Sequence, residues 1–125
     1  MRDAFEPKPY TGKTAFEQWV EHEGVPMIRN FIVPDLNAIR VEPWDRMGAA
    51  GSWVVLGAPQ DQLNMGAYVC EIAAGRSTRP QKHLFEELIF VLRGSGATTV
   101  WNEGEKPLSF EWKRGSLFSP PLNVW

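Results

Sequence analysis

The stretch GRSTRPQKHLFEELIFVLRG, from Gly75 to Gly94, decides how the rest of the chain is interpreted. It places Gln81 and His83 two residues apart and Glu87 four residues after His83. Residues two apart on a strand point to the same face. Amide oxygen, imidazole nitrogen and carboxylate are all lone-pair donors for a divalent metal. We therefore predict a small β-hairpin, with a glycine turn at its far end, that holds a metal.

Each of these residues also has a simpler structural interpretation. Taken alone, His83 is well explained as a structural histidine with hydrogen-bond partners, and Glu87 as half of a solvated pair with Glu86. The neighbouring Arg79 and Lys82 are then members of surface ion pairs, which contribute little to stability. Spacing favours Glu87 over Glu86 as the inward-facing carboxylate. Composition and spacing by themselves leave both interpretations open.

The bulk composition bounds the class of protein. A chain of 125 residues that is 43% hydrophobic and 22% charged is ordinary for one folded domain. The net charge of −2, without a basic stripe, argues against nucleic acid as a partner. No run approaches the ~18 apolar residues of a membrane span. Cys70 is the only cysteine and the N-terminus lacks an apolar core segment, so we expect a cytoplasmic protein.

One short helix is predicted near the N-terminus, after an extended arm at 1–13. The run Thr14-Ala15-Phe16-Glu17 has the capping-box pattern, a hydroxyl followed three residues later by a glutamate. Apolar residues then fall on one helical face until Gly24 ends the run. We predict a helix from Thr14 to about Glu23, with His22 on its surface.

Short strands are predicted over the rest of the chain. They lie at 27–33, 38–41, 52–56, 67–72, 88–92, 97–101, 109–112 and 117–118, with loops at 43–51 and 57–64. Tyr68 and Cys70 fall on one face of their strand. The 88–92 strand is apolar on both faces, which predicts that it is covered on both sides. Strands at this spacing predict an antiparallel sandwich or barrel.

The Gly75–Gly94 stretch resembles the first motif of the cupin family, which is Gly, five residues, His-x-His, three or four residues, Glu, six residues, Gly. Every spacing fits, and Gln81 stands in place of the first histidine. The second cupin motif resembles the sequence from Gly115 through Pro121-Leu122-Asn123. Asn123 replaces a glycine there, a mild change because both tolerate a left-handed backbone. The resemblance covers about half of the chain.

The resemblance implies a mostly β fold, a cupin-type antiparallel β-barrel or jelly roll with a short N-terminal helix. Residues 1–33 would form the N-terminal arm and helix, and 34–125 the barrel domain. The implied cofactor is a divalent transition metal, iron, manganese, zinc or nickel, held by Gln81, His83 and Glu87. Cupins include dioxygenases, decarboxylases, isomerases and binding proteins, so fold alone does not name the chemistry. For this chain we expect a metal-binding, dioxygenase-like or related oxidoreductase that acts on a small organic acid or ring compound. Larger two-barrel cupins are also similar to this chain in sequence.

The resemblance places the last metal-binding histidine directly after Trp125, where the printed sequence ends. We therefore expect a barrel that is incomplete at its C-terminal end, with an open edge and an exposed apolar seam. Such a surface predicts a homodimer, formed by sheet extension or by an exchanged arm, and residues 1–33 are long enough to cover the edge. Two alternatives stay open, a non-catalytic cupin that binds a small ligand and a fragment that lacks the last metal ligand.

Overall fold

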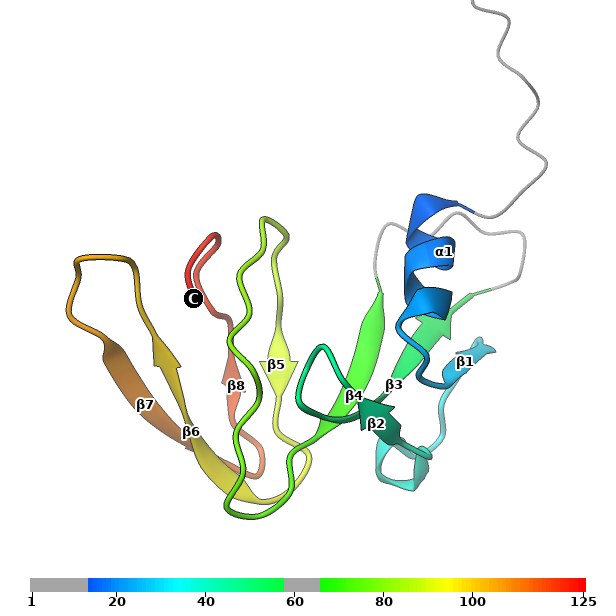
Figure 1. Ribbon diagram of the computed structural model, residues 1–125. Coiled ribbons are helices and arrows are strands. Elements are labelled where there is room, and N and C mark those ends of the chain that lie inside the picture. The colour runs from blue at the N-terminus through cyan, green and yellow to red at the C-terminus, as the bar shows by residue number, and fades with distance from the viewer. Residues whose placement is uncertain (1–13, 58–65) are drawn as a thin grey trace, which may run out of the picture.

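The computed structural model describes residues 14–57 and 66–125, and it is built mainly of short strands (Figure 1). The elements follow in the order α1 (Ala15–His22), β1 (Met27–Asn30), the 3₁₀ helix η1 (Leu36–Ala38), β2 (Glu42–Trp44), β3 (Ala49–Leu56), β4 (Ala67–Glu71), β5 (Ile89–Phe90), β6 (Ser95–Val100), β7 (Leu108–Lys113) and β8 (Leu117–Phe118). The predicted mostly β fold with one short helix is confirmed. The described strands form three separate sheets and no closed barrel.

The helix α1 begins and ends as its sequence predicts. The Glu17 amide donates to the Thr14 hydroxyl at 3.1 Å, and the Thr14 amide donates to the Glu17 carboxylate at 2.7 Å, which completes the capping box. The helix buries Val20 against the sheet, and His22 is exposed as predicted. Glu23 is its C-cap residue.

The largest sheet is organised around β3. One edge of β3 pairs with β1 in parallel and with β2 in antiparallel orientation, and the other edge pairs with β4 in antiparallel orientation. Trp53 lies opposite both Met27 and Tyr68, so β1 and β4 flank β3 at the same level. The pairing of β1 joins residues 27–30, part of the segment 1–33 predicted as N-terminal arm and helix, directly to the sheet that follows.

The second half of the molecule contains two smaller antiparallel sheets, β5 with β8 and β6 with β7. Phe110 and Phe118 hold the two together, with ring centroids 5.1 Å apart. Trp101 and Trp125 exchange backbone hydrogen bonds of 2.9 and 3.1 Å. In Figure 1 these strands lean away from the α1 and β1–β4 group toward the top of the view.

The hydrophobic core lies between α1 and the β3 sheet. Its buried members are Val20, Trp44, Met47 and Trp53, with Tyr68 and Cys70 packed against them. The Trp53 ring meets the rings of Trp44, Trp19 and Tyr68 edge-on, at centroid distances of 5.4, 5.4 and 5.5 Å. Edge-to-face pairs of this kind add about 1 kcal/mol each to the burial of apolar area.

Two predicted features between 38 and 51 are wrong. The segment predicted as a strand at 38–41 begins with the last residue of η1 and continues without regular structure. The Asp35 carboxylate caps η1 by accepting from the Asn37 amide at 2.9 Å. The predicted loop at 43–51 contains the last two residues of β2 and the first three of β3. A tight turn joins these two strands, and Gly48 adopts φ 66° in that turn.

The predicted double-sided covering of the 88–92 strand is also wrong. Only Ile89 and Phe90 form a strand, and Leu88 is 71% and Phe90 57% exposed. Val91 is buried. The apolar run has no second layer over it among the described residues. The predicted arm at 1–13 and nearly all of the predicted loop at 57–64 lie outside those residues.

Candidate functional site

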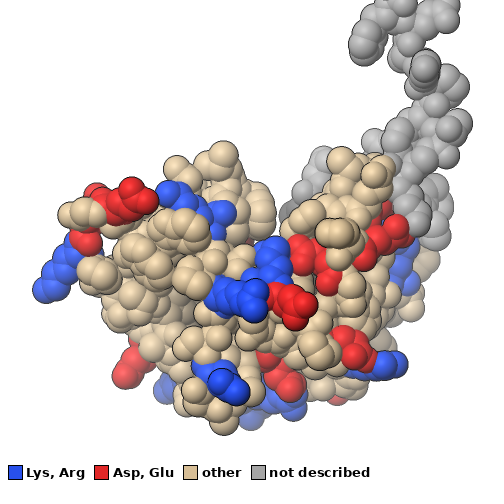
Figure 2. All heavy atoms as spheres, in the orientation of Figure 1, with Lys and Arg blue, Asp and Glu red and all other residues tan. Residues whose placement is uncertain are grey.

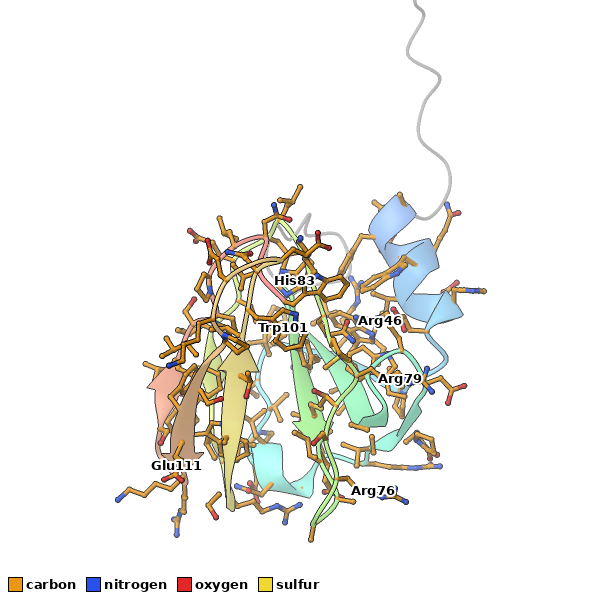
Figure 3. All side chains as sticks on the ribbon, turned by 60° about the vertical axis from the view of Figure 1, so that its left-hand side comes forward. Arg46, Arg76, Arg79, His83, Trp101 and Glu111 are labelled. Carbon is orange, nitrogen blue, oxygen red and sulfur yellow. The ribbon has the colours of Figure 1, made fainter. Side chains whose placement is uncertain are left out.

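The residues predicted as metal ligands lie between β4 and β5. Gln81 and His83 belong to the irregular segment that joins these strands, and Glu87 comes two residues before β5. Figure 3 shows His83 between the β6–β7 side and the β2–β4 side of the molecule. Glu87 is half-buried and bonded, whereas Glu86 is exposed, so the sequence identified the inward-facing carboxylate correctly.

The imidazole ring of His83 is fixed by Phe85, two residues further along the chain. Its Nδ1 lies 2.9 Å from the backbone oxygen of Phe85, and its ring stacks on the Phe85 ring at 3.7 Å and 1°. A carbonyl oxygen only accepts, so Nδ1 carries the proton of this hydrogen bond. In a neutral imidazole the lone pair then lies on Nε2.

That Nε2 faces a second acceptor. It lies 3.3 Å from Oε2 of Glu87, and the two side chains are only 25% and 16% exposed. A neutral imidazole nitrogen without a proton and a carboxylate oxygen do not attract one another. A cation between them, either a second proton on the imidazole or a metal ion, satisfies both.

The other oxygen of Glu87 has a donor of its own. Oε1 accepts the hydroxyl of Tyr68, a residue that projects from β4 toward the core. Burial raises the pKa of Tyr68 well above its ordinary value, and the hydrogen bond to the Glu87 carboxylate raises it further. The phenol therefore stays protonated and acts as a donor.

Among the described residues, the side chain of Gln81 forms its hydrogen bonds with Arg46 and Arg79, not with His83 or Glu87. Its Oε1 accepts from Nη1 of Arg46 at 2.7 Å, and its Nε2 donates to the backbone oxygens of Arg46 and Arg79 at 3.1 and 3.2 Å. No hydrogen bond joins Gln81 to His83 or Glu87 in the described part of the chain. Gln81 therefore keeps one oxygen lone pair for a ligand.

Arg46 is the residue that ties Gln81 to the rest of the fold, and sequence reasoning missed it. Its guanidinium lies 5.0 Å from the ring centroids of both Trp19 and Trp44. Its Nε donates to Glu23, whose other oxygen accepts from the Trp44 indole at 2.7 Å. No local pattern signals a contact between residues 35 positions apart.

The His83–Glu87 pair fits a divalent transition metal. Two ligands bound at about 2.1 Å to a tetrahedral ion lie about 3.4 Å apart, and the observed separation is 3.3 Å. A metal-binding histidine normally donates its second ring N–H to a carbonyl or carboxylate, as Nδ1 does here. Among residues 14–57 and 66–125, no group of three or more His, Cys, Asp or Glu side chains is placed to hold a metal, so further ligands would be Gln81 or water.

Cys70 lies on the same strand as Tyr68 but does not supply a thiolate. Burial, and to a lesser extent the Glu87 carboxylate, raise the pKa of the Cys70 thiol from 9.0 to about 11. The thiol is therefore neutral at physiological pH.

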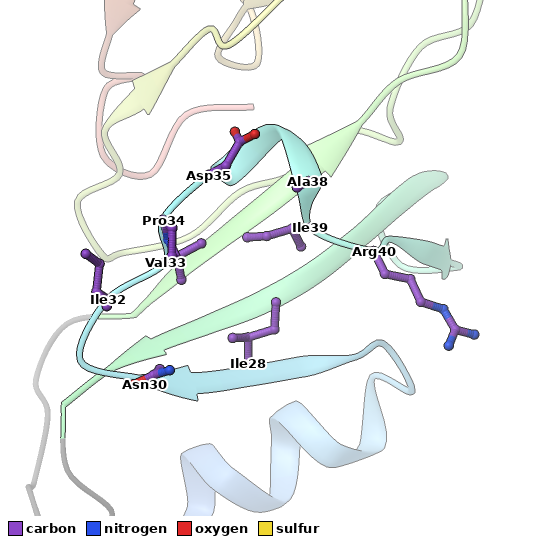
Figure 4. Close-up of a pocket in the computed structure, with 9 residues that line it drawn as sticks. All are labelled: Ile28, Asn30, Ile32, Val33, Pro34, Asp35, Ala38, Ile39 and Arg40. Atoms are coloured by element: carbon purple, nitrogen blue, oxygen red, sulfur yellow. The ribbon is translucent and has the colours of Figure 1, made fainter.

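A separate pocket of about 400 Å³ lies beside β1 and η1 (Figure 4). Its lining is mainly apolar and includes Ile28, Val33 and Ile39. Arg40 also lines it, and its guanidinium pairs with Glu42.

Comparison of the chain with protein-family models, with curated proteins and with solved structures gives no match. In the described residues, neither helix is long and apolar enough to cross a membrane.

Proposed function

We propose that the protein binds a divalent transition metal through His83 and Glu87, within a fold of the cupin type. The observation that carries this proposal is the fixed Nδ1 of His83, which leaves Nε2 facing Oε2 of Glu87 at 3.3 Å. Gln81 contributes its remaining oxygen lone pair as a weaker, neutral ligand. Its bond to Arg46 draws electron density away and places a positive charge nearby, so its contribution to affinity is small.

Backbone conformation supports the cupin-type fold as part of the proposal. The motif positions Gly75, Gly94 and Gly115 all have positive φ, from 73° to 84°. Asn123, which stands where the motif has a glycine, has φ 55°. These are the left-handed conformations that the motif residues tolerate.

The proposed activity is dioxygenase-like chemistry on a small organic acid or ring compound. When bound, the metal supplies a Lewis acid that polarises a substrate oxygen or activates dioxygen. The protein residues hold the arrangement: Phe85 fixes the imidazole of His83, Tyr68 fixes one oxygen of Glu87, and Arg46 fixes Gln81. The half-buried position of His83 and Glu87 limits the access of water.

Metal titration of the chelator-treated protein tests this proposal. We expect the wild-type chain to bind about one Mn²⁺ or Co²⁺ ion by calorimetry, and His83→Ala to lower the affinity at least about 100-fold, because a first ligand is lost. His22→Ala is the matched control, since His22 is the other histidine of the chain and lies exposed on α1. Equal affinity in wild type and His83→Ala would overturn the proposal.

A second candidate function is non-catalytic binding of a small apolar ligand. The mainly apolar pocket whose lining includes Ile28, Val33 and Ile39 favours it, because small-molecule sites are concave and mostly apolar. Absence of metal binding in the wild-type titration would favour this candidate over the metal site.

A further inference from the structure

Tyr68 connects the proposed metal site to the hydrophobic core. We propose that Tyr68 is a positioning residue, whose hydroxyl holds Oε1 of Glu87 so that Oε2 faces Nε2 of His83. The hydrogen bond from Tyr68 to Oε1 and the 3.3 Å separation of Oε2 from Nε2 carry this inference. It rests on the proposed metal-binding function and adds a residue to it.

A glutamate carboxylate needs such a donor because its last torsion angle is soft. The terminal χ3 of Glu has a broad, two-fold energy profile rather than three narrow wells. An unrestrained Glu87 would therefore present either oxygen, at a range of angles, to His83. A hydrogen bond to one oxygen removes that freedom before a ligand arrives, and pre-organisation of this kind raises affinity.

The Tyr68 ring is itself fixed in place. It meets the Trp44 ring at 5.3 Å and 88° and the Trp53 ring at 5.5 Å and 70°, and both tryptophans are buried. Tyr68 also lies directly opposite Trp53 in the register of β3 and β4. The hydroxyl therefore has one position, set by the core, from which to hold Glu87.

The hydrogen bond also determines how many oxygens Glu87 offers. With Oε1 occupied by the phenol, one oxygen remains for a cation, which favours coordination through a single oxygen. Without the donor both oxygens are available, and a chelating arrangement becomes possible. Loss of the Tyr68 hydroxyl should therefore change the coordination geometry as well as the affinity.

Three substitutions at position 68 separate the hydroxyl from the ring. Tyr68→Phe removes the donor, 4-methylphenylalanine removes it while keeping the volume, and 4-aminophenylalanine keeps both volume and a donor. We expect the first two to lower Co²⁺ affinity about 10- to 100-fold and to shift the visible Co²⁺ absorption bands. The 4-amino variant should restore both. Thr98→Val is the control, because it removes one side-chain hydrogen bond, from Trp112, between β6 and β7.

The outcomes separate this inference from the proposed function. Co²⁺ binding by wild type with equal affinity and an unchanged spectrum in Tyr68→Phe would overturn the positioning role and leave the metal site standing. Equal losses in the 4-methyl and 4-amino variants would also overturn it, because the donor would then be irrelevant. No Co²⁺ binding by the wild-type chain would overturn the metal site itself. Thermal unfolding of each variant verifies that the chain is folded, and the 4-methyl variant preserves packing if Tyr68→Phe unfolds.

Discussion

At the scale of single residues, burial sets the chemistry of Cys70. Its thiol has a pKa raised to about 11, mainly by burial, so the unfolded chain loses this proton at lower pH than the folded one. Deprotonation of Cys70 therefore lowers the free energy of unfolding. The contribution of the thiol is fully present below pH 9.0 and is lost as the pH rises toward about 11.

We expect slow alkylation of native Cys70 by iodoacetamide at pH 8, with a rate that rises up to about pH 11, because the thiolate is the nucleophile. Mass spectrometry of the native and urea-unfolded chain measures the two rates. A native rate equal to the unfolded rate at pH 8 would contradict this expectation.

Of the contacts made by single residues at the site, the sequence predicted one between neighbours along the chain and missed those between distant residues. The four-residue spacing correctly predicted that Glu87 lies near His83, because a short segment of chain keeps its two ends close together. The bond between Gln81 and Arg46 was missed because it depends on how the turn after β2 packs against a segment far along the chain. Alternation placed Tyr68 and Cys70 on one face of β4, which packs against the core, but no pattern names the partner of the Tyr68 hydroxyl.

At the scale of elements, one ion pair joins α1 to the turn between β2 and β3. Arg46 pairs with Glu23, the C-cap of the helix, whose side chain is only 7% exposed. Removal of the arginine leaves a buried carboxylate without its counter-charge, which is costly.

We expect Arg46→Ala to lower the free energy of unfolding by about 3 kcal/mol. Arg93→Ala is the matched control, because Arg93 and Glu71 form an exposed pair, and it should cost less than about 1 kcal/mol. Urea denaturation of both variants measures the difference. Equal midpoints for the two variants would show that the Glu23–Arg46 pair is not structural.

Local signals located some elements and not others. The capping box fixed the beginning of α1, and the strands predicted at 97–101, 109–112 and 117–118 correspond to β6, β7 and β8. The strand β2 was missed because its three residues include Pro43 and carry no alternation, and it forms only by pairing with β3. Tertiary pairing overrides weak local preference in such short strands.

At the scale of the whole molecule, nearly all buried apolar residues belong to the half that contains α1 and β1–β4, whereas exposed apolar residues occur in both halves. The core is around β3, whereas β5 and β8 bury little: Phe90 and Leu117 lie directly opposite each other, 57% and 60% exposed. Figure 2 shows a mainly uncharged surface over the side of the molecule that holds β6–β8. The residue pattern predicted the strands of this half but wrongly predicted that 88–92 is covered on both sides. The cupin resemblance, in contrast, predicted an exposed apolar seam.

We propose that a second copy of the chain covers the Phe90–Leu117 face, because a two-fold axis pairs an apolar patch with itself. Multi-angle light scattering should give a mass above the 14.2 kDa of a single chain. The double variant Phe90→Ser, Leu117→Ser should return the mass to that value, since serine removes the apolar area that drives association. Phe31→Ser is the control, because Phe31 is 76% exposed but follows β1, in the other half. A wild-type mass of one chain at every concentration would contradict the dimer. An equal effect of both variants would place the interface elsewhere.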